Sequence, residues 1–124
     1  MCSSDLATAT TGLSLVLISP EDPARAQELR DWADFVHIRH IAAVAVPGYC
    51  MITPYANVAG GDPRFLHFYE MDTDEPEHAF KSMTPLVIER IGDPSTEAFK
   101  QWAWGPSLRI MYVNSFLRVG ELAR

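Results

Sequence analysis

Residues 31–40 read DWADFVHIRH and lie in the middle of the longest helical pattern in this 124-residue chain. The pattern begins after the acid and proline cluster PEDP at residues 20–23, where Asp22 is suited to cap a helix and Pro23 to occupy its first position. We therefore predict a helix over residues 23–43. The segments on either side of this helix decide the fold.

A strand is predicted before the helix, because residues 13–19, LSLVLIS, form an apolar run between a glycine and a proline. After the helix, Pro47 and Gly48 signal a turn into a second strand over residues 49–58. The glycine-rich loop AGGDPR then leads into a third, FLHFYEMD at residues 65–72, which we expect to pair antiparallel with the second.

The remaining third of the chain predicts more helix and a closing strand. A short helix is expected to start near Glu75, and a further helical piece is expected over residues 95–104 with Ser95 as its cap. Residues 107–119 form the last strand. The resulting order βαββαβ predicts a ferredoxin-like α+β fold, with a four-stranded antiparallel sheet and helices on one face.

Domain organisation follows from the same pattern. Residues 13–120 are predicted to form one ferredoxin-like domain, and residues 1–12 a flexible N-terminal tail. The strands are apolar on both faces, so the sheet face without helices would be exposed apolar surface. We expect a second copy of the chain to cover it, as a homodimer.

Composition excludes several classes of partner. The net charge is −6, with 10 Lys and Arg against 16 Asp and Glu, which argues against nucleic acid. No apolar run approaches the roughly 20 residues that span a bilayer, so no membrane partner is expected. The first residues lack the basic start and apolar stretch of a secretory signal, and a cytoplasmic location is the expectation.

The two histidines of DWADFVHIRH are separated by a helical wheel at about 100° per residue. With Leu29 as origin, the inward positions are Ala33, Val36, His40 and Ala43, and His37 lies on the flank of the apolar stripe. In the simplest interpretation His40 is a satisfied core histidine and His37 pairs with Asp34. In the alternative, one of them is a general acid/base in a pocket between helix and sheet.

Alternation along residues 65–72 places a second set of side chains on one strand face. His67 and Tyr69 share that face with Phe65 and Met71, either in the pocket or at the dimer interface. The complete set of candidates is catalytic His40, His37, His67 and Tyr69, and substrate-binding Trp32, Val36, Phe65, Met71 and Trp102. No metal site is predicted, because His37 and His40 lack a third ligand at a convincing spacing.

Three segments carry a family resemblance: DWADFVHIRHIAAVAVPGY, PRFLHFYEMD and VNSFLRVGE. Together they resemble the dimeric α/β-barrel superfamily, and within it the EthD-like proteins and their uncharacterised bacterial relatives. Trp32, Asp34, His37 and Pro47-Gly48-Tyr49 match the family pattern, over a likeness that covers roughly residues 13–120. Arg39 stands where the family usually has Pro, Ala33 where Tyr is common, and His40 is additional.

The resemblance implies a dimer in which two sheets face each other, and a ligand pocket in each subunit between sheet and helices. With the apolar, aromatic candidates it implies a cofactor-independent acid/base enzyme of the lyase, isomerase or cyclase type, acting on a hydrophobic oxygenated or polyketide-like small molecule. The alternatives are a cofactor-free or haem-dependent mono-oxygenase, and a ligand-binding dimer without catalysis. No cofactor is expected in the favoured case, and haem is the cofactor considered in the alternative.

Overall fold

The computed structural model describes residues 10–120, so most of the predicted tail lies outside the described part of the chain. The elements, in chain order, are β1 (Gly12–Pro20), η1 (Pro23–Arg25), α2 (Ala26–Trp32), η2 (Ala33–His37), α3 (Ile38–Val44), β2 (Tyr49–Ala56), β3 (Phe65–Met71), α4 (Pro76–Lys81), α5 (Met83–Ile91), α6 (Glu97–Ala103) and β4 (Leu108–Leu117). None of the helices in this part of the chain is long and apolar enough to cross a membrane.

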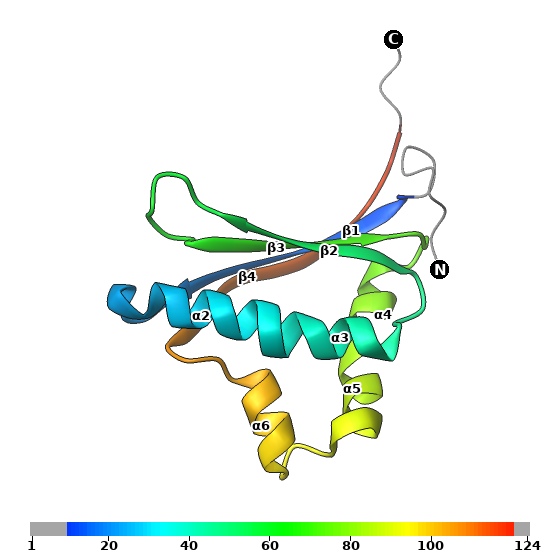
Figure 1. Ribbon diagram of the computed structural model, residues 1–124. Helices are drawn as coiled ribbons and strands as arrows, with labels where there is room; N and C mark the ends of the chain where they lie inside the picture. The colour runs from blue at the N-terminus through cyan, green and yellow to red at the C-terminus, as the bar shows by residue number, and fades with distance from the viewer. Residues whose placement is uncertain (1–9, 121–124) are drawn as a thin grey trace.

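The four strands form one antiparallel sheet in the order β2-β3-β1-β4. The helices all lie against the same face of this sheet, and the other face carries none (Figure 1). The chain therefore has the predicted ferredoxin-like α+β fold. The predicted first helix is also confirmed, because η1, α2, η2 and α3 follow one another without a break from Pro23 to Val44.

Three local predictions need correction. The helix α5 was not predicted; its proline, Pro85, sits in the first turn, where the backbone N–H it lacks would have no helical partner. Ser95 does not cap α6, because the side chain of Thr96 accepts the hydrogen bond from the Phe99 amide at 3.2 Å. The boundary of the tail is also wrong: the Thr11 amide already donates to the Met71 carbonyl at 2.9 Å.

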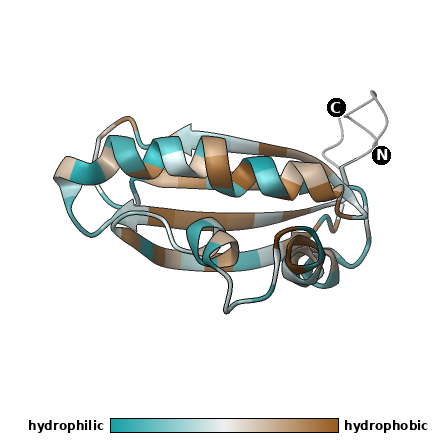
Figure 2. Ribbon diagram, turned by 60° about the horizontal axis from the view of Figure 1, so that its bottom comes forward, coloured by the Kyte–Doolittle hydropathy of each residue, from teal (hydrophilic) through white to brown (hydrophobic). Residues whose placement is uncertain are grey.

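The core lies between the sheet and the helices. Burial alternates along β3, where Phe65, His67, Tyr69 and Met71 are buried and the residues between them are half-buried. Residues of β1 paired with them, Ser14, Val16 and Ile18, are buried on the same side. Figure 2 views the molecule from the side of the helices and shows hydrophobic residues, in brown, on the strands and on the long helix.

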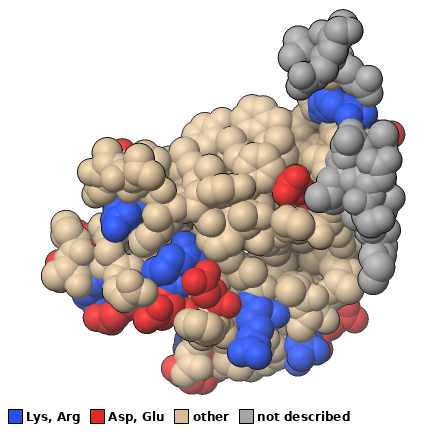
Figure 3. All heavy atoms as spheres, turned by 45° about the horizontal axis from the view of Figure 1, so that its top comes forward, with Lys and Arg blue, Asp and Glu red and all other residues tan. Residues whose placement is uncertain are grey.

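The opposite face of the sheet is apolar and uncovered. Figure 3 shows it as a broad surface with few charges, while charged groups gather along one edge of the molecule. The register places the intervening residues of each strand on this face. Its apolar members are Leu13, Leu15, Leu17, Met51, Tyr55, Leu66, Phe68, Tyr112 and Phe116, and the open surface they form has the character of an interaction site.

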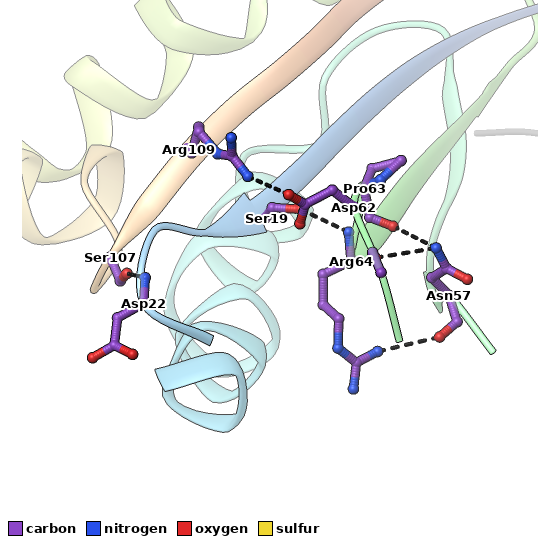
Figure 4. A network of polar contacts seen from close by, with 9 residues as sticks. Ser19, Asp22, Asn57, Asp62, Pro63, Arg64, Ser107 and Arg109 are labelled. Carbon is purple, nitrogen blue, oxygen red and sulfur yellow. Dashed lines mark hydrogen bonds and ion pairs between the residues drawn. The ribbon is translucent and has the colours of Figure 1, made fainter. Parts of the chain in front are cut away.

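A network of polar contacts ties the β2–β3 loop to the central strand at one end of the sheet (Figure 4). The buried Ser19 hydroxyl donates to Asp62 Oδ1 at 2.6 Å and accepts from the Arg64 amide at 2.8 Å. Asp62 Oδ2 accepts from Arg109 at 2.6 Å. Through these contacts the loop that leads into β3 is fixed to β1 and β4.

Candidate functional site

The middle of the long helix, η2, is a π-helix, in which the Ile38 amide donates to the Ala33 carbonyl five residues earlier. A single wide turn of this kind inserts one extra residue into the helical repeat, and it is frequent at functional sites. Because of it, the inward positions after Ala33 shift by one. The inward set is Leu29, Ala33, His37, Ile41 and Val44, where the regular wheel predicted Val36, His40 and Ala43.

The shift turns His37 toward the C-terminal part of α6, where it meets Trp102 in two hydrogen bonds. His37 Nδ1 lies 2.9 Å from the Trp102 carbonyl oxygen, and Trp102 Nε1 donates to the His37 carbonyl at 3.0 Å. Since a carbonyl only accepts, His37 Nδ1 carries the proton. In the neutral ring Nε2 then keeps its lone pair, which is the form a general base requires.

Two indole rings flank the His37 imidazole. Trp102 stacks on it at 5.0 Å between centroids with 17° between the planes, and Trp32 lies at 4.8 Å on a tilted plane. Trp32 is itself fixed, because its Nε1 donates to the Gln101 carbonyl at 2.8 Å. Gly105 allows this approach: a Cβ at that position would lie 2.5 Å from Trp32 Cε3.

A cavity of about 50 Å³ lies beside this imidazole, between η2 and the strands β1, β3 and β4. Only a few water molecules, or one end of a small ligand, fit a space of this size. Two histidines are the titratable groups among its lining residues, which are Val16, Ile18, Trp32, His37, His67, Ala103, Leu108 and Ile110. The site is thus an apolar recess with two imidazoles.

The second imidazole belongs to His67, which is 2% exposed and projects from the middle of β3. Its Nε2 is buried and has no hydrogen-bond partner in the structure. Leaving such a group unpaired costs about 1–3 kcal/mol. An unpaired nitrogen in the wall of a cavity indicates a place where a ligand or water supplies the missing partner.

Burial holds both rings in the neutral state. Burial, with a smaller contribution from the nearby Arg30 guanidinium, lowers the pKa of His67 to about 3. Burial likewise lowers the pKa of His37, with the hydrogen bond to the Trp102 carbonyl opposing the shift. At neutral pH, His67 is therefore a hydrogen-bond donor and acceptor, and a poor proton acceptor.

Of the predicted catalytic residues, His37 and His67 come together and the other two do not. His40, placed at the centre of the inward stripe, is half-buried and does not line this cavity, because the π-helix turns Ile41 inward in its stead. Tyr69 is 1% exposed and packs edge-on against Tyr49 and Phe80, at 5.7 and 5.3 Å between centroids. It is a core residue away from the cavity, and burial raises its pKa.

The predicted substrate-binding residues divide in the same way. Trp32 lines the cavity and Trp102 backs His37. Val36 is half-buried outside the cavity lining, and Met71 is fully buried opposite Gly12 and Tyr49, at the other end of β3. The predicted pairing of His37 with Asp34 is also wrong, since Asp34 forms its ion pair with Arg30.

Phe65 lies under two arginines that the sequence did not single out. The guanidinium carbons of Arg30 and Arg64 are each 5.0 Å from the centroid of its ring. Arg30 also holds Asp34, through Nη2 at 2.5 Å and Nε at 3.2 Å. The spacing of Arg30, Asp34 and His37 along the helix is the signal that could have identified this cluster, because these positions succeed one another by about one turn.

The part of the chain that the structure describes contains no group of three or more His, Cys, Asp or Glu side chains that could hold a metal ion. His37 and His67 are the nitrogen ligands that line the cavity. The cavity between them is walled by apolar side chains, so it provides no carboxylate to complete a coordination shell.

The fold has a counterpart among solved structures. The chain is similar to a dimeric ferredoxin-like protein from an uncultured marine organism, with a TM-score of 0.60 and 13% sequence identity, over 93% of this chain and 100% of that one. No protein-family model and no curated protein matches the chain. This structural similarity supports the ferredoxin-like fold of the chain. Membership of the EthD-like proteins stays a prediction.

The pKa of His67 predicts a pH dependence of stability. In the unfolded chain a histidine titrates near 6.5, so between that value and about 3 the unfolded state binds a proton that the folded state does not. The free energy of unfolding should therefore fall as the pH drops below about 6.5, by up to about 1.4 kcal/mol per pH unit from this group. Urea unfolding of the wild type and His67→Gln from about pH 7 to about pH 4 measures it. Equal slopes in the two proteins would contradict the assignment.

Proposed function

We propose that this chain is an acid/base enzyme that acts on a small carbonyl compound, with His37 as the base. The observation that carries the proposal is the hydrogen bond from His37 Nδ1 to the Trp102 carbonyl, which leaves the Nε2 lone pair of a neutral imidazole at a cavity. The unpartnered Nε2 of His67 in the same cavity wall supports it, because it offers a donor to a substrate oxygen.

The chemistry would run between these two rings. His37 Nε2 takes the proton from a carbon next to the substrate carbonyl, and the electron pair of the broken C–H bond moves to the carbonyl oxygen as the enolate. The N–H of neutral His67 donates to that oxygen and stabilises its charge. Return of the proton from His37 to the same or a neighbouring carbon completes an exchange or an isomerisation and regenerates the base.

The walls of the cavity favour a substrate with one polar end. The space of about 50 Å³ accepts a carbonyl and its neighbouring carbons, and it is bordered by Leu108 and Ile110 of β4. Ile110 is 54% exposed, so an apolar portion of a ligand could extend along that strand. This supports a hydrophobic, oxygen-bearing molecule, and within the predicted reaction types it favours an isomerase or lyase over a cyclase that encloses a long polyketide.

Haem does not fit this site. His37 Nε2 could ligate iron, but the cavity beside it holds only a few water molecules, far less than the volume of a porphyrin, and Trp32 lies 4.8 Å from the imidazole centroid. We therefore derive no step through haem. Cofactor-free oxygenation remains the alternative that shares the first step, because it too begins with removal of a proton from carbon.

We also propose that two copies of the chain pair through the open face of the sheet. That face presents apolar side chains on all four strands, with Glu70, Thr53 and Asn114 as its polar members. Its charge is too small to favour an acidic or basic partner, whereas an identical apolar face is self-complementary. The similar marine protein, matched over its whole length, is described as dimeric, which supports the same assembly here.

The acid/base proposal predicts exchange of carbon-bound hydrogen. In D₂O the wild type should accelerate deuterium incorporation next to the carbonyl of cyclohexanone or acetophenone, followed by proton NMR. His37→Gln should reduce the accelerated rate by about 10²- to 10⁴-fold, the range that a general base contributes. His40→Gln is the matched control, because it changes a histidine three residues along the same helix, outside the cavity lining, and should keep the rate.

Equal rates in the two variants would remove His37 from the mechanism. If neither ketone exchanges faster with the wild type but both shift the His37 and His67 resonances on binding, the non-catalytic ligand-binding reading stands and the enzyme proposal fails.

The dimer proposal predicts a solution mass of two chains, measured by light scattering during size-exclusion chromatography. Phe68→Glu places a charge in the middle of the open face and should produce a folded monomer, because the buried carboxylate would be unpaired at the interface. Phe35→Glu is the control, since Phe35 is 65% exposed on the helix layer. A wild-type monomer, or a Phe68→Glu dimer, would refute pairing through this face.

A further inference from the structure

Two buried side-chain nitrogen atoms between the long helix and β3 have no hydrogen-bond partner. One is Nε2 of His67, and the other is Nη1 of Arg30. Among the described residues the buried side-chain atoms without a hydrogen bond are Thr10 Oγ1, Arg30 Nη1, Tyr49 Oη and His67 Nε2, so these two make up half of that set. A buried polar group that stays unpaired destabilises the protein, and more so where the group is charged.

The two groups approach the same side of β3. The Arg30 guanidinium lies over the ring of Phe65, which is two residues before His67 and therefore points to the same face of the strand. Arg30 is oriented firmly, because its Nε and Nη2 are both occupied by Asp34. The third nitrogen of the guanidinium group, Nη1, is buried and has no hydrogen-bond partner.

The local charge favours an anion as the missing partner. Arg30 and Arg64 place two guanidinium groups 5.0 Å from the same ring, and Asp34 neutralises one of them. Arg64 Nη1 donates to the Asn57 carbonyl at 3.3 Å, and none of the ion pairs in residues 10–120 joins Arg64 to a carboxylate. The net positive charge next to these two unpaired nitrogen atoms attracts a negatively charged oxygen.

We propose that Arg30 Nη1 and His67 Nε2 together bind one anionic oxygen of the substrate, a carboxylate or an enolate. This inference rests on the proposed function and names its substrate class: a small carbonyl compound that bears an acidic group, such as an oxo acid or a 1,3-dicarbonyl. Arg30 becomes a substrate-binding residue. His67 shares the oxygen, and His37 remains the base.

The test compares anions with neutral molecules of the same shape. Benzoate supplies a carboxylate and 1,3-cyclohexanedione an enolate at neutral pH, while benzamide and cyclohexanone are their uncharged counterparts. Side-chain ¹⁵N resonances of Arg30 and His67 in the wild-type protein report binding. We expect saturable shifts of both residues with at least one anion, and at least about ten-fold weaker binding of its neutral counterpart.

Arg30→Gln should weaken binding of the responding anion by about ten- to a hundred-fold, the range of a hydrogen bond to a charged group. Arg64→Gln is the matched control, since Arg64 contacts the same ring at the same distance but has no unpaired buried nitrogen, and it should stay within about two-fold. If Arg30→Gln does not fold, Arg30→Lys keeps the charge without the fork and should show the same direction of change.

The outcomes separate this inference from the proposed function. Loss of anion binding in Arg30→Gln, together with wild-type ketone exchange that is lost in His37→Gln, supports both. Anion binding that is equal in Arg30→Gln and Arg64→Gln, or an absence of shifts at Arg30 and His67 with both anions, overturns the inference whatever happens to ketone exchange. An ordered water that pairs both nitrogens and is not displaced by either anion overturns it as well.

Discussion

The candidate site depends on the pair of hydrogen bonds between His37 and Trp102. Each residue donates from its side chain to the other's backbone carbonyl, at 2.9 and 3.0 Å, so the end of the π-helix and the end of α6 are joined twice. The pair fixes the tautomer of His37, stacks an indole on its ring and brings the last helix against the first. Without it, neither the direction of the lone pair nor the wall of the cavity would be determined.

The same pair gives the π-helix a role. A wide turn is less favourable than a regular one, and it persists only where other contacts compensate. Here it turns His37 inward, where Trp102 and Trp32 enclose the imidazole, and His40 is rotated out of the buried stripe. A π turn, two buried imidazoles and an unpaired nitrogen lie together here, and this combination marks the cavity as the candidate site.

Periodicity predicted most of the fold and less of the site. Strand runs, turn signals and the long helix were enough for the βαββαβ order, since each reflects a local pattern of apolar residues. The wheel failed at His40, because it assumes a constant angle per residue and a single π turn shifts every later position. The family pattern selected His37, which the structure places in the cavity. Arg30 was missed because an arginine four residues before an aspartate is usually a surface ion pair.

The central claim is that His37 presents an unprotonated Nε2 to the cavity, and its tautomer can be observed directly. Long-range ¹H–¹⁵N correlation spectra of the ¹⁵N-labelled protein at neutral pH distinguish the two ring nitrogens. The account predicts a neutral His37 with the proton on Nδ1 and a free lone pair on Nε2. A proton on Nε2, or a ring charged at neutral pH, would contradict the account, because His37 could then not act as the base.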